Sequence, residues 1–243
     1  MNNLKNKLTS IYKNHKILFS SLIALLFLNY LILIILKLTP YKDLKDFQNK
    51  DYSIRYYDRN NILLQVSSID DGLKREFTPL NEIPKDVKKA FLTAEDKRFY
   101  FHQGVDLIAL TGALIQNSKS RRIVRGGSTI TMQLAKTINN SSEVTVSRKL
   151  KDILTSFRIE AKLTKKQILE LYLNTIYLGY GSYGVDAAAK AYFSKDVSEL
   201  TLLECAQLAA LPQSPTAYSP LKRIETSKIE DPDKYDIKYK YDR

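Results

Sequence analysis

A run of about 20 residues without a charged side chain, from Ile17 to Leu36, constrains this chain more than any other feature. At ~1.5 Å per residue, a helix of this length crosses a hydrocarbon layer about 30 Å thick. Lysines without any acidic residue precede the run, whereas lysines and aspartates alternate after it. The excess of positive charge predicts a cytoplasmic N-terminus and an outer location for the rest of the chain. No small-x-small cleavage site follows before Pro40, which indicates an uncleaved signal anchor.

The anchor divides the chain into unequal parts. A length of 243 residues leaves room for one substantial domain with a core of its own. The last 22 or so residues are rich in charges and tyrosines and poor in aliphatic residues, which is typical of a poorly ordered segment. We therefore expect a cytoplasmic tail (1–16), a transmembrane anchor (17–36), a juxtamembrane linker (37–51), one domain (52–221), and a charged tail or truncated linker (222–243).

The net charge of +12 predicts an anionic partner. Nucleic acid, an acidic membrane surface and a phosphorylated lipid are the three candidates, and an outer location excludes nucleic acid. The single cysteine, Cys205, lies in an apolar helical run and is expected to be a buried, inert thiol. His15 and His102 are too far apart for a zinc motif, so we expect no metal site of that kind.

Hydrophobic periodicity predicts a mostly α-helical domain. An alternation of period two from Ile54 to Val66, interrupted at Asn60-Asn61, predicts a short N-terminal β-hairpin. From Pro84 to Leu211 the apolar spacing is helical. Capping boxes at Thr164-Gln167 and Thr201-Glu204 each start a helix, and they account for Gln167 and Glu204 without any chemistry.

The acidic residues Glu95 and Asp96 lie at the predicted end of the helix that starts near Pro84. Gly104 then breaks the chain, and Asp106 can cap the next helix. A carboxylate at such a junction can face a cleft, where burial raises its pKa towards that of a general base. The alternative is a solvated pair that serves the helix end, and the pair taken alone favours this alternative.

A second constellation follows Gly126-Gly127. Ser128, Thr129, Gln133 and Lys136 could hold a diphosphate through backbone N–H groups, hydroxyls and a cation. The alternative is an ordinary turn in which Ser or Thr caps a helix. The segment lacks the ending of a nucleotide-binding P-loop.

A third constellation is a pair of opposite charges, Arg148 and Asp152, which share one helical face. They could line a cleft as cation and carboxylate. Alternatively they form an exposed ion pair that contributes only a few tenths of a kcal/mol.

Taken in order, these motifs resemble the peptidoglycan glycosyltransferase domain, the family 51 transglycosylases, over residues from about 54 to 220. The resemblance implies a lysozyme-like, mostly α-helical fold outside the cytoplasmic membrane of a bacterium. It implies polymerisation of lipid II into glycan strands by inverting attack of the acceptor N-acetylglucosamine 4-hydroxyl on the lipid-diphosphate-linked donor. The matching segments are Glu95-Asp96 with Phe99, His102 and Gly104; Gly126 to Thr129 with Gln133 and Lys136; Arg148-Lys149; Ile168 to Gly179; and Glu204 to Pro220.

The resemblance also implies roles for single residues. Glu95 would be the general base, with Asp152 as the second acidic group. Lys136 and Arg148 would neutralise the diphosphate, and the further substrate contacts would be Ser128, Thr129, Gln133, Asp96 and His102. No cofactor is required, although a divalent cation such as Mg or Mn helps the family. The implied partners are lipid II, the growing glycan strand and other proteins of cell-wall synthesis.

The chain departs from the family pattern at Asp152, where a glutamate is usual. The shorter side chain sets its carboxylate back by roughly 1.5 Å, which is large by catalytic standards, so we expect weakened activity. A lipid II-binding scaffold without full activity is the alternative function, and a lysozyme-like hydrolase is another. Transpeptidase motifs are missing after the anchor, which indicates either a monofunctional enzyme or a piece of a longer chain.

Overall fold

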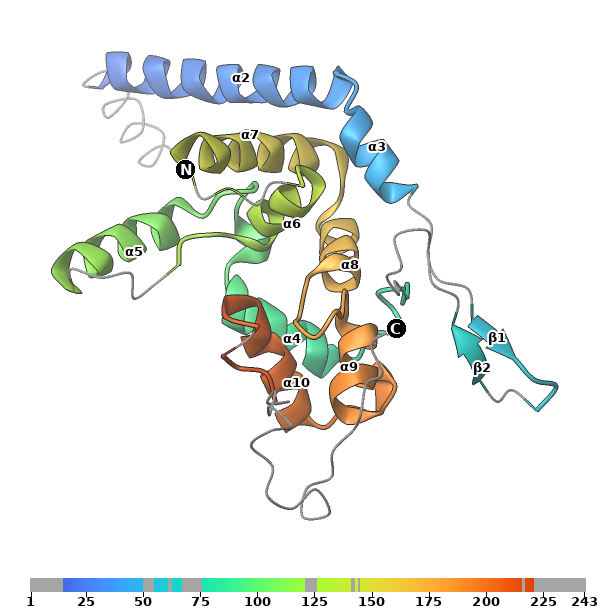
Figure 1. The fold of residues 1–243 in the computed structure, drawn as a ribbon. Coiled ribbons are helices and arrows are strands. Elements are labelled where there is room, and N and C mark those ends of the chain that lie inside the picture. The colour runs from blue at the N-terminus through green and yellow to red at the C-terminus, as the bar shows by residue number, and fades with distance from the viewer. Residues whose placement is uncertain are drawn as a thin grey trace, which may run out of the picture.

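The computed structural model describes residues 15–49, 55–60, 63–66, 76–120, 126–140, 143, 145–215 and 217–220. This part of the chain is mostly α-helical, as predicted. The predicted hairpin is also present, because β1 (Arg55–Tyr57) pairs antiparallel with β2 (Leu63–Val66), and Arg59 and Asn60 form a turn after β1 (Figure 1). Residues 1–14 of the predicted cytoplasmic tail (1–16) and the whole of the predicted charged tail (222–243) lie outside the described residues.

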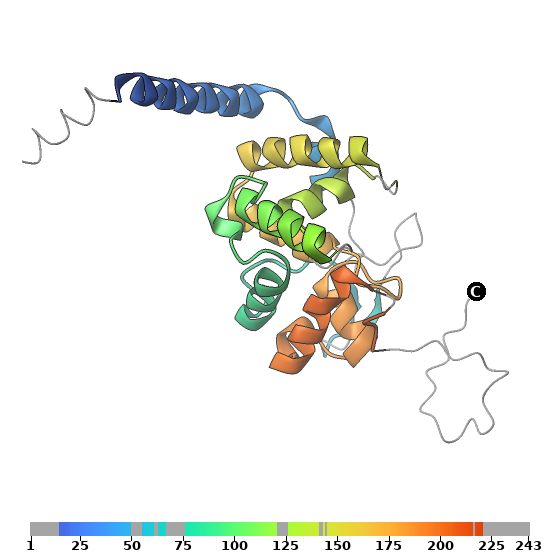
Figure 2. The ribbon, with the colours of Figure 1, turned by 90° about the vertical axis from the view of Figure 1, so that its left-hand side faces the viewer.

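The apolar run forms helix α2, Lys16–Leu38. Its segment Leu18–Leu38 has a mean hydropathy of 2.5, is not buried within the protein, and is long and apolar enough to cross a membrane. Figure 2 shows the N-terminal part of α2 extending beyond the rest of the helices.

The segment predicted as a linker contains a short helix, α3 (Lys42–Gln48). Tyr41, Leu44 and Phe47 recur at intervals of three, and all three side chains are buried in the main core. Residues spaced by three lie on the same face of a short helix. The predicted linker therefore contains a helix with a buried apolar face, which the charged residues between these apolar positions did not suggest.

Helix α7, Val146–Lys162, packs alongside α2 (Figure 1). The Lys162 ammonium donates to the carbonyl of Lys37 at 2.9 Å, and Arg158 donates to the carbonyl of Pro40 at 3.3 Å. The Arg158 guanidinium also lies 4.5 Å from the centre of the Tyr41 ring. These contacts join the end of the apolar helix to the domain.

The core brings together helices that are distant in sequence. Helix α4 (Lys85–Glu95) packs on α10 (Leu202–Ala210), and α6 (Ile130–Ile138) packs against α7 and α8 (Lys165–Thr175). Helix α9 (Val185–Phe193) contacts both α8 and α10. The remaining elements are α5 (Leu107–Ser120) and the 3-10 helices η1 (Phe99–Phe101), η2 (Val197–Glu199) and η3 (Leu211–Gln213).

The predicted helix ends are confirmed. Capping boxes start α8 at Thr164 and α10 at Thr201, and Cys205 is buried in α10. Gly184 ends the turn between α8 and α9 with a φ of +87°, and a Cβ there would come within 2.6 Å of the Asn174 carbonyl oxygen. Only glycine fits this close approach.

Candidate active site

Glu95 is the last residue of α4, and its side chain is half-buried. The Gln133 side-chain amide, from α6, donates to Glu95 Oε2 at 2.6 Å. Burial is the main reason why the pKa of Glu95 is raised, and the neighbouring charge of Asp96 adds to it, whereas the hydrogen bond from Gln133 opposes it. A carboxylate with a raised pKa at this junction is suited to accept a proton from an alcohol.

Tyr172 of α8 determines which way Gln133 points. Its hydroxyl donates to Gln133 Oε1 at 3.2 Å, and the ring is 1% exposed. Burial holds the pKa of Tyr172 well above its usual range, so the phenol keeps its proton and remains a donor. The Gln133 oxygen is thereby engaged, which leaves its NH₂ group for Glu95. No hydrogen bond within the described part of the chain reaches Glu95 Oε1.

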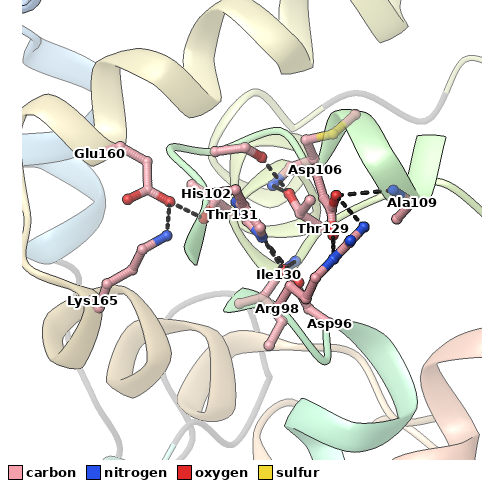
Figure 3. Close-up of polar contacts among 12 residues, drawn as sticks. Asp96, Arg98, His102, Asp106, Ala109, Thr129, Ile130, Thr131, Glu160 and Lys165 are labelled. Atoms are coloured by element: carbon pink, nitrogen blue, oxygen red, sulfur yellow. Dashed lines mark hydrogen bonds and ion pairs between the residues drawn. The ribbon is translucent and has the colours of Figure 1, made fainter. Parts of the chain in front are cut away.

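Asp96 connects two helices of the site. Its buried carboxylate accepts from the backbone N–H of Ile130, the first residue of α6, at 3.0 Å and from His102 Nε2 at 2.9 Å (Figure 3). The end of α4 is therefore held against the start of α6, from which Gln133 projects. These contacts occupy Asp96 and one nitrogen of His102 within the protein, and their predicted contact with a substrate stays a prediction.

Asp106 caps α5, as predicted, through a hydrogen bond of 2.9 Å from the backbone N–H of Ala109 (Figure 3). Arg98 donates to both of its oxygens, at 2.8 and 2.6 Å. Burial opposes ionisation of Asp106, but the Ala109 bond and the Arg98 cation outweigh it and lower the pKa of Asp106. Asp106 is therefore a structural carboxylate.

The same region contains a cluster that could hold a metal ion, because ligand atoms of Asp96, His102 and Asp106 lie within 4.8 Å of one another. An ion there would have to displace Arg98 from Asp106 and the Ile130 N–H from Asp96. A guanidinium that already neutralises one of the carboxylates does not fit a divalent cation. We therefore derive no catalytic step through this cluster.

Arg148 and Asp152 form a buried pair on α7. Arg148 Nη1 lies 3.4 Å from Asp152 Oδ2, and the two side chains are 16% and 3% exposed. Asn139, which follows α6, donates to Asp152 Oδ1 at 3.1 Å. The alternative of an exposed surface pair is therefore wrong, and the pair belongs to the interior between α6 and α7.

Lys149 lies beside this pair and, with Arg148 and Lys136, forms a group of three cations. Its contact with Ser128 was not predicted. Its ammonium donates to the hydroxyl of Ser128. Burial lowers the pKa of Lys149, and the nearby charges of Arg148 and Lys136 lower it further, whereas Asp152 opposes them. Lys136 itself is exposed on the last turn of α6. The only sequence signal for Lys149 was its place beside Arg148.

Thr129 caps α6, which was the structural alternative for this segment. Its hydroxyl oxygen accepts from the backbone N–H of Met132 at 3.1 Å and donates its proton to the carbonyl of Gly104. The side chain is 2% exposed. Ser128, in contrast, accepts from Lys149 and retains a hydroxyl proton that it can donate. A substrate contact by Thr129 remains a prediction.

Helix α6 joins the two halves of the site. Gln133, which contacts Glu95, and Lys136, which lies among the cations, are three residues apart and therefore adjacent on the helix surface. The start of α6 is held by Asp96 and its end by Asn139. Helix α6 consequently connects Glu95, which contacts Gln133, with three cations: Lys136 on α6 itself and Arg148 and Lys149 on the neighbouring α7.

Comparisons with known proteins identify relatives of this chain. Penicillin-binding protein 4 of Bacillus subtilis (strain 168) is 44% identical over 186 residues, which are 76% of this chain and 30% of that protein. Penicillin-binding protein 1A of Aquifex aeolicus (strain VF5) is 49% identical over 152 residues, 63% of this chain and 21% of that protein. The chain thus spans less than a third of each of these relatives.

A crystal structure of penicillin-binding protein 1A from Haemophilus influenzae aligns with 70% of this chain and 15% of that chain, at 25% identity and a TM-score of 0.31. The family described as Transglycosylase matches residues 61–235, which is most of the chain and includes every residue of the candidate site. The chain belongs to the transglycosylase family.

Proposed function

We propose that this domain is a peptidoglycan glycosyltransferase, which polymerises lipid II into glycan strands. The observation that carries the proposal is the pairing of Glu95, a half-buried carboxylate with a raised pKa, with three cations along α6 and α7. Transfer of a sugar from a lipid diphosphate requires both parts, a base for the attacking hydroxyl and positive charge for the departing diphosphate.

In the proposed reaction, the 4-hydroxyl of the acceptor N-acetylglucosamine attacks the anomeric carbon of the donor with inversion. Glu95 Oε1 takes the hydroxyl proton while the new C–O bond forms. The bond from the anomeric carbon to the diphosphate oxygen breaks, and both electrons leave with the undecaprenyl diphosphate. Lys136, Arg148 and Lys149 neutralise the growing negative charge, and Ser128 donates a hydrogen bond to it.

Other side chains of the site position these groups. Gln133, held by Tyr172, occupies Oε2 of Glu95 and leaves Oε1 for the acceptor. Asp96 and His102 hold the junction of α4 and α6, which supports a positioning role for both. Removal of either would displace the base relative to the cations along α6.

The proposed location is the outer face of the cytoplasmic membrane, with α2 as the anchor and the N-terminus in the cytoplasm. The charge difference across the apolar run supports this orientation. Helix α5 leaves Leu107, Ile108 and Ile115 between 58% and 70% exposed. An apolar face of this kind supports insertion of α5 into the bilayer, where a lipid-borne substrate would be found.

Asp152 distinguishes a full transferase from the alternative, a weakened lipid II-binding scaffold. We expect Asp152→Glu to raise the rate of lipid II polymerisation several-fold, because the longer side chain carries the carboxylate about 1.5 Å further from the backbone, where the glutamate usual in the family would place it. The measurement is the initial rate of glycan strand formation by the purified chain in detergent. A large loss of activity in Asp152→Glu would instead show that the Asn139 contact has adapted this site to aspartate.

The pH dependence of the rate tests the environment of Glu95. Polymerisation should fall as the pH drops through the raised pKa of Glu95, since only the ionised base accepts a proton. Gln133→Ala removes a hydrogen bond that lowers this pKa, so the acid limb of kcat/KM should move to higher pH. Lys42→Gln, an exposed change on α3, is the control. An unshifted acid limb in Gln133→Ala would assign that limb to another group.

A further inference from the structure

A second positively charged site lies outside the candidate active site, in a pocket of about 650 Å³ between α4, α8 and η1. Half of the residues that line this basic pocket are lysines, namely Lys85, Lys88, Lys89, Lys97 and Lys166. No acidic residue lines it. The pocket contains neither Glu95 nor any of the three cations of the active site, so the transferase mechanism leaves it unused.

Most of this positive charge is uncompensated. Lys88 donates to the neutral carbonyl of Leu80 at 2.9 Å, and within the described part of the chain none of the five lysines has an ion pair. Lys165, next in sequence to Lys166, is in contrast paired with Glu160 at 2.7 Å. Lys85 and Lys89 are four residues apart on α4, where like charges repel. An anion bound in the pocket would relieve this repulsion.

Apolar side chains also line the basic pocket. Leu80, Leu92 and Leu169 line it, and Leu169 is only 1% exposed. Glu170 of α8 accepts from the backbone N–H of Leu80 at 2.7 Å and so holds this segment in place. Four of the five lysines are exposed and Lys88 is half-buried, so their charges face the solvent and are accessible to a ligand, whose binding salt should weaken.

The positions of the lysines along α4 indicate the shape of the anion. Lys85 is the first residue of α4, whereas Lys97 follows its last turn, and α4 has 11 residues. At ~1.5 Å per residue the helix is about 16 Å long. Lys166 is the second residue of α8, where the helix dipole adds positive potential. Charge spread over this length suits a linear chain with repeated negative groups better than one small anion.

The kind of cation indicates the kind of negative group. All five cations of the pocket are lysines, and no arginine lines it. An ammonium is a compact point charge that binds phosphate from many directions, whereas the planar guanidinium of arginine holds a carboxylate or a phosphate in one fixed geometry through two parallel hydrogen bonds. A set of lysines therefore suits repeated contacts with the phosphate groups of a flexible chain. We propose that the basic pocket binds a linear polyanion with repeating phosphate groups. This proposal goes beyond the transferase reaction and does not depend on it.

The test measures binding of a labelled linear polyphosphate of about 15 units to the full chain in detergent, by fluorescence anisotropy at several salt concentrations. The pocket variant is Lys85→Gln/Lys89→Gln/Lys97→Gln. The control variant, Lys42→Gln/Lys45→Gln/Lys119→Gln, removes the same charge from exposed lysines outside the pocket. We expect at least about tenfold weaker binding and a flatter salt dependence in the pocket variant, with little change in the control.

Several outcomes would overturn the proposal. Equal losses in both variants would show an effect of net charge only. Loss of binding in Lys136→Ala with full binding in the pocket variant would place the polyanion in the active site. Equally tight binding of inorganic phosphate would exclude a linear ligand, and tighter binding of polyglutamate would assign the pocket to an acidic peptide. Vesicles of phosphatidylglycerol that bind the pocket variant more weakly, while polyphosphate binding is unchanged, would assign it to a membrane surface.

Lipid II polymerisation by the pocket variant distinguishes a failure of this proposal from a failure of the proposed function. The pocket lysines take no part in the transferase mechanism, so the pocket variant should polymerise lipid II at the unmodified rate. Lys97→Glu/Lys166→Glu provides a second variant, which combines the lysine after α4 with the pocket lysine of α8, and it should weaken polyphosphate binding further by reversing the charge. Unchanged binding in this second variant would also contradict the proposal.

Discussion

Glu95→Gln should reduce the rate of lipid II polymerisation by about 10²- to 10⁴-fold, the range that a general base contributes. Glutamine has nearly the same shape as glutamate and can still accept the hydrogen bond from Gln133, but it cannot take a proton from the acceptor hydroxyl. Removal of a half-buried carboxylate whose pKa is raised should not unfold the domain. The measurement is kcat for glycan strand formation, with thermal unfolding as the check on the fold.

The matched control for this substitution is Glu82→Gln, an exposed glutamate just before α4, which should leave the rate unchanged. Binding of lipid II by Glu95→Gln should also be preserved, because the three cations that would hold the diphosphate are intact. If Glu95→Gln polymerises lipid II as fast as the unmodified chain, Glu95 is not the base. If both forms bind lipid II and neither polymerises it, the scaffold alternative holds.

Asp152→Ala should have the largest effect on stability, a loss of about 3 kcal/mol in the free energy of unfolding. The substitution leaves the mostly buried Arg148 without its carboxylate and the Asn139 amide without its acceptor. It also removes the charge that supports ionisation of Lys149, so the pKa of Lys149 should fall further. Polymerisation should fall with it, because the cations would be displaced from the diphosphate. Urea unfolding of the detergent-solubilised chain measures the first effect.

Asp46→Ala provides the control, since it removes an exposed aspartate from α3 and should cost less than about 0.5 kcal/mol. The double variant Arg148→Ala/Asp152→Ala should lose less stability than the sum of its single variants, because it leaves no unpaired buried charge. A cost for Asp152→Ala as small as that of the control would mean that solvent screens the pair. The burial of Asp152 would then have no energetic consequence.

Local patterns predicted much of this fold. The apolar run that forms α2, the capping boxes at Thr164 and Thr201, and the cap of α5 at Asp106 depend on residues within one or two turns of each other. Such signals need no knowledge of the rest of the chain. The expected linker after α2 was less accurate, because the buried face of α3 exists only where the core covers Leu44 and Phe47.

The order of the motifs was enough to list most of the candidate site, including Glu95, Gln133, Lys136 and Arg148. It did not reveal how these residues depend on one another. The resemblance suggested that Asp96 and His102 contact the substrate, which stays a prediction; the structure adds that Asp96 is hydrogen-bonded to His102 and to the backbone at the start of α6. A motif identifies which residues occur together in a family, but not which of them face a ligand.

By itself, the sequence determined the apolar helix, the helix caps and the identity of the acidic and basic side chains, since these follow from neighbouring residues. Only the tertiary structure decided their environment. Tyr172 orients Gln133, which is 39 residues away in the sequence, and Gln133 contacts Glu95, which is another 38 residues away. Lys149 contacts Ser128, from which it is separated by 21 positions in the sequence. The physical reason is that burial and long-range hydrogen bonds depend on the packing of α4, α6, α7 and α8, and these set the pKa of Glu95 and the pairing of Asp152.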